Sequence, residues 1–326
     1  MKKTADTTRT HYFAVFGDIH GRVALMYVLS QLWQNYTGNE LTNILQVGDM
    51  GAFPDHTRLD SATIKHARRD PDELDFKEYC YKSPSCNRYL GSSDLPSTYF
   101  IRGNHEDFDY LDGFRPRQSV DPWKQLRYLP DGSHVNLRLL NEETTFDELW
   151  TGEQEDNQHV ECLCLAGFGG IQPRSRDRGR GKKARKNYRK NNKKISKEKK
   201  FFSSDALSVA FSSLESIDIL MTHAGPQCER LPGGSYMLTQ LAERIQPTFH
   251  FFGHHHVVIE PTQQPWGSTL VGLDHLDFTK DGILFDNAWG ILEWNETPTF
   301  TMANTDTMPW LREVRRDNYR SMFKTV

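Results

Sequence analysis

The sequence has few cysteines and no long apolar run. Its 326 residues include five cysteines, an odd and sparse set that does not suit a disulfide framework and indicates a reducing compartment. No run of about 18 apolar residues occurs, so we expect no transmembrane helix. The first residues, MKKTADTTRTHYF, have no apolar segment behind their lysines, which argues against a secretory signal peptide. We therefore expect a cytoplasmic protein, or a nuclear one in a eukaryotic source, with no membrane partner.

The chain also lacks a strong net charge, but its charge is unevenly distributed. With 37% hydrophobic and 25% charged residues and a net charge of −3, it is typical of a folded globular protein. Residues 173–200 nevertheless hold 15 lysines and arginines against two acids, a charge of +13, which leaves −16 on the rest. An acidic body with one basic arm indicates contact with a specific polyanion.

Short apolar runs that end abruptly in polar clusters are the main pattern of the chain. Such runs, rich in Val, Ile, Phe and Leu and bounded by glycine, are typical of buried strands. The clusters that follow them are GDIHGR, GDMG, RGNHED, GFGG, THAGP and GHHH. Helix-like segments at residues 23–36 and 203–217 separate several of the runs. The pattern predicts an α/β fold with its polar clusters at the carboxyl ends of strands, where open α/β sheets place their active sites.

We expect one domain over residues 10–300 that carries two insertions. Residues 53–97 are polar and helix-prone, with helix starts indicated at Asp70-Pro71 and Ser83-Pro84, and are expected to form a lid or cap. The basic arm, residues 173–200, has no hydrophobic periodicity and is expected to be mobile until it meets a partner.

The last part of the chain predicts a strand pair and then a short helix. Residues 282–295 and 297–302 have the pattern of two strands, and residues 310–323 that of a helix, so that residues 301–326 form a C-terminal tail or helix. Cys162 and Cys164 lie two apart in the apolar run ECLCLAGF. We expect them to be buried thiols of a strand rather than metal ligands.

The polar clusters together supply two aspartates, one asparagine and several histidines. A neighbouring glycine permits the sharp turn that aims each ligand. Carboxylate and imidazole ligands suit Mn, Fe or Zn better than Ca or Mg. Two such ions about 3.5–4 Å apart can share a carboxylate, clamp a phosphate and lower the pKa of a bridging water. The clusters therefore predict a dinuclear metal centre.

Five blocks in order along the chain resemble the calcineurin-like metallophosphoesterases. They are Asp18-Ile19-His20, Gly48-Asp49, Gly103-Asn104-His105-Glu106, His223 and Gly253-His254-His255-His256. The resemblance covers about residues 12–295 outside the insertions. It implies a four-layer α/β sandwich of two mixed sheets with flanking helices, and hydrolysis of a phosphoester by a metal-bridging hydroxide.

The same resemblance implies a role for each ligand. The first metal would be held by Asp18, His20 and His256, the second by Asn104, His223 and His254, and Asp49 would bridge the two. His105 would stabilise the transition state or protonate the leaving oxygen. Asp18 would help to orient His105 by fixing its tautomer.

Three other residues, one inside the last block and two beside the blocks, are further candidates for the site. His255 either points away from the metals or adds a proton donor at the rim. Arg22 and Arg102 flank the blocks in sequence. Each arginine either contacts phosphate or forms a structural ion pair.

The segment after Asp49 narrows the class of substrate. Serine/threonine protein phosphatases and symmetric dinucleoside tetraphosphatases of this superfamily carry Asp-Arg-Gly a few residues after the aspartate of the second block. Here the segment reads GDMGAF, from Gly48 to Phe53, without that arginine. Both classes are therefore disfavoured.

The basic arm favours nucleic acid as the partner. It follows the strand-end cluster AGFGG directly, so its root is expected at the edge that holds the metals. Its first arginines, Arg174, Arg176 and Arg178, are candidate substrate contacts, because clustered cations attract a phosphate backbone. The alternatives are a solvated loop and a nuclear import signal.

A narrower resemblance is to RNA lariat debranching enzymes, which hydrolyse 2′,5′-phosphodiesters. It rests on GNHE, on Gly169-Gly170-Ile171 with the basic loop as far as Arg178, and on Thr222-His223. The first block differs, because debranching enzymes typically have Cys where this chain has Asp18.

The sequence leaves three hypotheses, in this order. The first is a metal-dependent phosphodiesterase acting on RNA or DNA, either a nuclease or a debranching enzyme. The second is a phosphomonoesterase for a small molecule or a phosphoprotein, since one scaffold hosts all of these activities. The third is a nucleic-acid-binding protein with a silent metal centre. The identity of the metals and the oligomeric state are left open.

Overall fold

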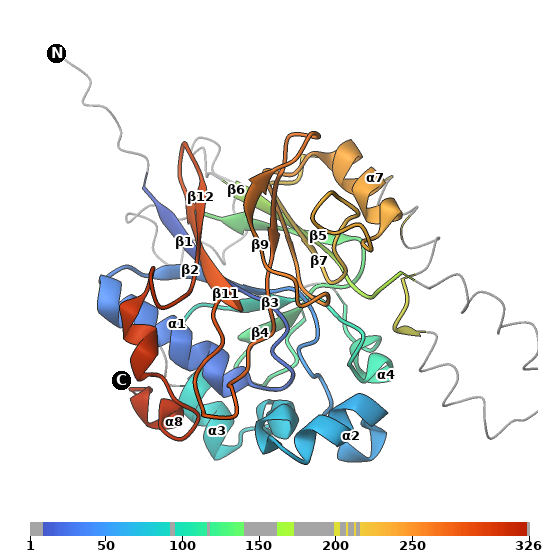
Figure 1. Ribbon diagram of the computed structural model, residues 1–326. Coiled ribbons are helices and arrows are strands. Elements are labelled where there is room, and N and C mark those ends of the chain that lie inside the picture. Colours follow the sequence, from blue (N-terminus) through green and yellow to red (C-terminus); the bar gives the residue numbers. More distant parts are fainter. Residues whose placement is uncertain are drawn as a thin grey trace, which may run out of the picture.

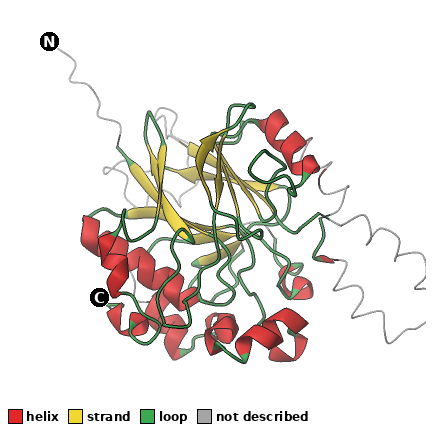
Figure 2. Cartoon of the chain, in the orientation of Figure 1, coloured by secondary structure: helices red, strands yellow, loops and turns green. Residues whose placement is uncertain are grey.

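The chain folds into two six-stranded mixed sheets with helices on their outer faces (Figures 1 and 2). This computed structural model describes residues 9–91, 95–115, 118–139, 162–172, 199–202, 207, 212 and 216–324. Within these ranges no helix is both long and apolar enough to cross a membrane. The α/β architecture of two mixed sheets with flanking helices, expected from the sequence, is confirmed.

The first sheet holds the strands that begin and end the domain. Its members are β1 (His11–Phe16), β2 (Leu41–Gln46), β3 (Thr98–Phe100), β4 (Leu126–Tyr128), β11 (Trp289–Trp294) and β12 (Thr299–Met302). Their order is β12-β11-β1-β2-β3-β4, with β1 to β4 parallel and β11 antiparallel to both β1 and β12. The predicted closing strand pair is confirmed as β11 and β12.

The second sheet carries the middle of the chain. Its members are β5 (Ser133–Arg138), β6 (Cys162–Phe168), β7 (Ile219–Thr222), β8 (Phe249–Phe252), β9 (Ile259–Gln263) and β10 (Thr269–Gly272). The order is β5-β6-β7-β8-β10-β9. The four inner strands are parallel, and the edge strands β5 and β9 are antiparallel to their neighbours.

The alternation of side chains along β1 explains how one strand serves two cores. Phe13 and Val15 pack between the two sheets, together with Leu165 and Phe251 of the second sheet. Their neighbours Ala14 and Phe16 point to the opposite face and pack with the helices. Successive residues of a strand face opposite sides, so a strand buried on both sides reads as a continuous apolar run.

Two helices cover the outer faces of the sheets. The predicted helix over residues 23–36 is confirmed as α1 (Val23–Thr37), which ends where Gly38 adopts a left-handed conformation and donates its N–H to Gln34 O, a common helix ending. α7 (Tyr236–Ile245) buries Leu238 and Leu241 against the second sheet. The predicted helix at 203–217 lies largely outside the described residues.

The described part of residues 53–97 contains a series of short helices on the same side of the molecule as α1 (Figure 1). These are η1 (His56–Arg58), α2 (Ser61–Ala67), η2 (Pro71–Tyr79), α3 (Pro84–Cys86) and η3 (Asn87–Gly91). Asp70 and Ser83 cap η2 and α3 through their side chains, at the helix starts that the sequence indicated. Phe76 and Tyr79 share one apolar core with α1, so much of this segment belongs to the helical layer on the first sheet.

The C-terminal region contains two short helices instead of the single predicted one over residues 310–323. They are η6 (Pro309–Glu313) and α8 (Tyr319–Met322). The break occurs because Val314 is extended, with ψ 116°. Tyr319 then donates a hydrogen bond of 2.6 Å to Asp72, which joins the end of the chain to η2.

The prediction of two buried thiols in β6 is wrong for Cys162. Cys162 is exposed and Cys164 is half-buried, and both are free. The pairing of β6 with β7 starts only at Leu165, so the first residues of β6 extend beyond the neighbouring strand.

Arg22, buried at the start of α1, is surrounded by three carboxylates. Its Nη2 lies 2.8 Å from Asp70 Oδ2, 3.1 Å from Asp277 Oδ1 and 3.4 Å from Glu73 Oε1. The side chain is only 2% exposed. Arg22 therefore forms a buried structural ion pair, one of the two roles left open by the sequence.

The Glu73 carboxyl should make stability depend on pH. Burial raises the pKa of Glu73 to about 7, although Arg22 lies beside it. Between about pH 5 and pH 7 the folded protein then holds a proton that the unfolded chain has released, so stability falls as pH rises through this window. The wild type should therefore lose about 2 kcal/mol of unfolding free energy between about pH 5 and pH 8. Glu73→Gln cannot titrate and should not lose it, so the variant gains this amount relative to wild type over the same pH range. Urea unfolding measures this, and an equal difference at the two pH values would contradict it.

Candidate metal centre

The proposed metal ligands all follow the carboxyl ends of strands, and they come from both sheets. Asp18 and His20 follow β1, Asp49 follows β2, and Asn104 follows β3; His223 follows β7, and His254 and His256 follow β8. β1, β2 and β3 are parallel neighbours in one sheet, and β7 and β8 in the other. The parallel order thus brings residues far apart in sequence to one place.

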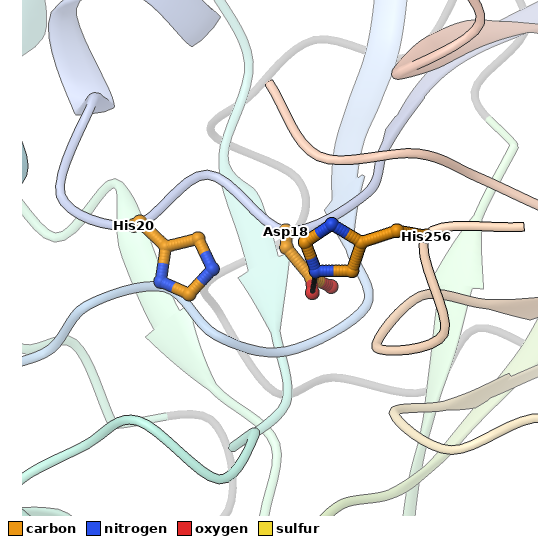
Figure 3. A group of neighbouring side chains, drawn as sticks. All are labelled: Asp18, His20 and His256. Carbon is orange, nitrogen blue, oxygen red and sulfur yellow. Dashed lines mark ion pairs between the residues drawn. The ribbon is translucent and has the colours of Figure 1, made fainter. Parts of the chain in front are cut away.

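The first group consists of Asp18, His20 and His256, whose ligand atoms lie within 4.8 Å of one another. Figure 3 shows the carboxylate of Asp18 beside the ring of His256. His256 Nε2 is 3.6 Å from Asp18 Oδ2. These are the three residues that the sequence predicted for the first metal.

The second group surrounds Asp49. One ligand atom from each of Asp49, Asp18 and His223 also lies within 4.8 Å of the other two. His223 Nε2 is 3.5 Å from Asp49 Oδ1 and 3.1 Å from Asn104 Oδ1, and the rings of His223 and His254 are 5.0 Å apart. Asp49 Oδ2 faces the other way, 3.9 Å from His20 Nε2. One carboxylate oxygen of Asp49 thus faces each group, an arrangement that would allow Asp49 to bridge two ions.

Backbone groups hold these side chains in place. The amides of Asn104 and His105 donate to Asp49 Oδ1 at 2.6 and 2.7 Å. The His223 Nδ1 lies 3.1 Å from Val47 O. A hydrogen bond at one ring nitrogen leaves the other free for a metal, which is the usual support of a ligating histidine.

Four of the seven ligands have left-handed backbones. The φ angles are 43° at His20, 52° at Asp49, 61° at His254 and 50° at His256. Such conformations cost about 1–3 kcal/mol each for a residue other than glycine and cluster at functional sites. The tertiary structure therefore holds these four residues in backbone conformations that they would otherwise disfavour.

Two glycines in the blocks allow the close approach of chain to carboxylate. A Cβ on Gly103 would lie 2.0 Å from Asp49 Oδ1, and a Cβ on Gly253 would lie 2.2 Å from Asp18 Oδ1. Any side chain at either position would displace a metal ligand.

Glu106 connects two of the loops that carry proposed ligands. Its carboxylate accepts hydrogen bonds from the amides of Met50 and Ala52 after β2 and of Gly103 after β3. It is 3% exposed, and burial raises its pKa to about 8. Glu106 is therefore a support of the site and not a ligand.

The donor set suits divalent cations. Asp18 and Asp49 are 1% and 2% exposed, and burial together with the Asp49 charge raises the pKa of Asp18 to about 7. Burial lowers the pKa values of His20 and His254 to about 3, so both offer free ring nitrogens at neutral pH. Two buried carboxylates beside several imidazoles form a donor set that suits divalent cations of the Mn, Fe or Zn type. The residues present thus fit the two metal ions of the resemblance.

His105 is oriented by a residue that the sequence did not indicate. Its Nδ1 lies 2.6 Å from Asp60 Oδ2, so the partner is Asp60 and not Asp18 as expected. Asp60 is itself fixed, because its Oδ1 caps α2 by accepting from the amides of Ala62 and Thr63. Burial opposes protonation of His105, but Asp49 and Asp60 raise its pKa to about 9. No local pattern could have found Asp60, since it lies in the inserted segment far from the blocks.

We expect Asp60→Asn to lower kcat about 10- to 100-fold with little change in KM, because His105 loses the carboxylate that holds its proton and orientation. Asparagine can still cap α2, so the fold should survive. Steady-state kinetics measures the effect. Asp55→Asn, a change at the cap of η1 on the surface, is the matched control and should leave kcat unchanged; equal kcat values in the two variants would contradict this role of Asp60.

The remaining predicted contacts are placed as follows. The Nε of Arg102 donates a hydrogen bond of 2.9 Å to Asp131 Oδ2. Arg102 is 9% exposed, so it too forms a structural ion pair. His255 is half-buried, and its Nε2 has no hydrogen-bond partner in the part of the chain that the structure describes. Its ring lies against Phe252 and His254, which does not suit a donor at the rim. Arg174, Arg176 and Arg178 lie outside the described residues.

One further group of possible ligands adjoins the centre. Asp274 and His275 follow β10, and with His256 they bring three ligand atoms within 4.8 Å of one another. Neither residue could be predicted as a ligand from the sequence, because the cluster LDHLD has no spacing typical of a known motif.

Comparison with protein families gives one match. The model of the family described as calcineurin-like phosphoesterase matches residues 11–258, a range that includes all seven proposed ligands. No curated protein sequence matches this chain significantly.

Several solved structures are similar to this one at low sequence identity. GAP50, the anchor in the inner membrane complex of Plasmodium, is 14% identical with a TM-score of 0.43, covering 90% of this chain and 84% of its own. A novel phosphatase of Mycoplasma pneumoniae is 12% identical with a TM-score of 0.39, covering 96% and 100%. The sulfate thiohydrolase SoxB of Thermus thermophilus, in complex with glycerol, is 11% identical with a TM-score of 0.38, covering 94% and 46%.

Proposed function

This chain belongs to the calcineurin-like phosphoesterase family, and we propose that it is a dinuclear-metal phosphodiesterase that hydrolyses nucleic acid. That it is a metal-dependent phosphoesterase follows from the family. The choice of a nucleic-acid diester is our proposal, and it rests on where the ends of the basic arm lie.

Both ends of the basic arm are held next to the metal centre. Gly170, just before the arm, donates its amide to Arg102 O, and the Arg102 side chain donates to Lys199 O near the end of the arm. Ile171 and Phe201 also form a bridge. Arg102 is two residues from the proposed ligand Asn104. The described residues at the two ends of the arm therefore lie beside the edge that carries the proposed ligands, which supports the proposal that cations of the arm attract a phosphate backbone there.

In this proposal each residue near the reacting phosphate has a task. Asp18, His20 and His256 would hold one ion, and Asn104, His223 and His254 the other, with Asp49 between them. Two bound ions would supply Lewis acidity toward the phosphate and a lowered pKa for the attacking water. His105, which Asp60 holds through Nδ1, keeps a proton that it can give to the leaving oxygen.

One gel tests the proposal. End-labelled single-stranded RNA, single-stranded DNA, duplex DNA and a 2′,5′-branched RNA are incubated with Mn²⁺-loaded protein, with Asp49→Asn in parallel lanes. We expect cleavage of at least one substrate by the wild type alone, and selectivity for the branch would identify a debranching enzyme. No cleavage in any lane, together with rapid hydrolysis of an aryl phosphomonoester, would refute the nucleic-acid proposal in favour of a phosphomonoesterase.

A second variant tests the role of the arm. Changing the six lysines and arginines between residues 182 and 190 to glutamine should weaken nucleic-acid cleavage and its dependence on salt. Hydrolysis of a small aryl phosphodiester should remain unchanged, because the metal ligands are untouched. Equal losses on both substrates would contradict a role of the arm in binding.

A further inference from the structure

His256 is the most exposed of the ligand histidines that face Asp18. Its side chain is 46% exposed, against 0% for His223. The two ring nitrogens of His256 face different carboxylates: Nε2 lies 3.6 Å from Asp18 Oδ2, and Nδ1 lies 3.8 Å from Asp274 Oδ1. A solvated ligand with a strained backbone, φ 50°, needs something else to fix its ring.

Asp274 is itself firmly held. Its Oδ1 accepts from the backbone amide of His275 at 2.7 Å and lies 2.8 Å from His275 Nδ1. Its own amide donates to Asn287 O at 3.1 Å, and the amide of Leu276 donates to Asp18 O at 2.7 Å. The loop after β10 is thereby bonded to the loop that carries Asp18, so the Asp274 carboxylate is part of a rigid support.

The ring of His275 limits the ring of His256 from one face. Their centroids are 4.4 Å apart at 36°, and Phe285 lies edge-on behind His275 at 5.1 Å. His256 thus has a carboxylate at Nδ1 and an aromatic ring on one face, and the proposed metal position at Nε2.

We propose that Asp274 is a positioning residue for the first metal: its carboxylate, which His275 holds in place, faces Nδ1 of His256 at 3.8 Å and favours the tautomer that keeps its proton there. This arrangement orients Nε2 toward the metal and makes the ring a stronger donor. On the second metal side, Val47 O lies within hydrogen-bond distance of His223 Nδ1, at 3.1 Å. The proposal rests on the metal centre within the proposed function and not on the identity of the substrate.

The same three side chains could instead bind a third ion. Metal bonds of about 2.0–2.2 Å would allow the observed spacings of 2.8 and 3.8 Å between the nitrogens and Asp274 Oδ1. A third ion would, however, require His256 to lose its Nδ1 proton while Nε2 stays on the first metal. A neutral imidazole that keeps its Nδ1 proton facing Asp274 leaves Nε2 free for the first metal, which favours the positioning role.

Metal affinity tests the proposal independently of turnover. Metal-free wild type, Asp274→Asn, His275→Phe and Asn104→Ala are titrated with Zn²⁺ against a chromophoric chelator, which yields the number of ions and their dissociation constants. Asn104→Ala identifies the constant of the second metal. We expect Asp274→Asn to weaken the other constant about 10- to 100-fold and leave the second unchanged. His275→Phe, which keeps the packing on His256, should weaken the same constant less.

Controls separate this effect from loss of charge or fold. Asp281→Asn changes an exposed aspartate of the same loop and should bind both ions as the wild type does. Thermal unfolding of the metal-free variants confirms that each is folded. Unchanged constants in Asp274→Asn, equal weakening of both constants, or three ions bound by the wild type with one lost in Asp274→Asn would each overturn the proposal. Two ions bound without hydrolysis of any phosphoester would instead refute the proposed function and leave this inference intact.

Discussion

Replacing Asp49 with asparagine is expected to lower kcat/KM by at least about 10³-fold, a loss on the order of 4 kcal/mol of transition-state stabilisation. Asp49 is the carboxylate whose two oxygens face both groups of ligands, at 3.5 Å from His223 and 3.9 Å from His20. Asparagine keeps one oxygen but replaces the other with an amide group that cannot bind a cation. One metal should therefore be lost or displaced, and with it the two-metal activation of water.

The fold of the Asp49→Asn variant should survive. The remaining oxygen can still accept from the amides of Asn104 and His105, which now donate to Oδ1. Circular dichroism and urea unfolding test this point, and Asp281→Asn on the surface serves as the control for activity. A variant that binds metal and keeps more than a tenth of the wild-type activity would contradict the bridging role of Asp49.

Replacing Arg22 with methionine is expected to destabilise the fold by about 3–5 kcal/mol, because it leaves buried carboxylates without their cation. Asp70 and Glu73 are 8% and 6% exposed, and both bond to the guanidinium together with Asp277. Methionine fills a similar volume without charge, so the effect reports the ion pairs more than a cavity. Urea unfolding at neutral pH measures the change in unfolding free energy.

Arg316→Met is the matched control for Arg22→Met. Arg316 also pairs with Asp277, at 3.6 Å, but its side chain is 38% exposed, and such a pair contributes at most about 1 kcal/mol. If Arg22→Met instead left stability unchanged and raised KM, then Arg22 would contact the phosphate of the substrate after all.

That the proposed metal ligands gather in one place could be predicted from the sequence, because each follows the end of a short apolar strand within a few residues. Asp18, Asp49 and His223 stand at strand ends, and parallel strands bring such ends together whatever the sequence distance between them. The glycines beside them are also visible in the sequence, and their reason is close packing: Gly103 and Gly253 leave no room for a Cβ next to the two carboxylates.

The supports of the site could not be predicted, because they come from segments without a period or motif. Asp60 reaches His105 from the inserted helices, and Asp274 reaches His256 from a loop after β10. For Arg22 the sequence left open both a phosphate contact and a structural ion pair. Arg22 follows His20 closely in sequence, but its side chain turns into the cluster of Asp70, Glu73 and Asp277. Nearness in sequence therefore did not predict which side chains share a site.

The most direct test of a dinuclear centre that hydrolyses phosphodiesters is titration of metal-free protein with Mn²⁺ while hydrolysis of bis(p-nitrophenyl) phosphate is followed. The arrangement of Asp18, Asp49 and the ligand histidines predicts that the rate rises with added metal and reaches its plateau when two ions are bound per chain. A rate that is independent of metal, or a chain that binds two ions and shows no hydrolysis of any phosphoester, would contradict it.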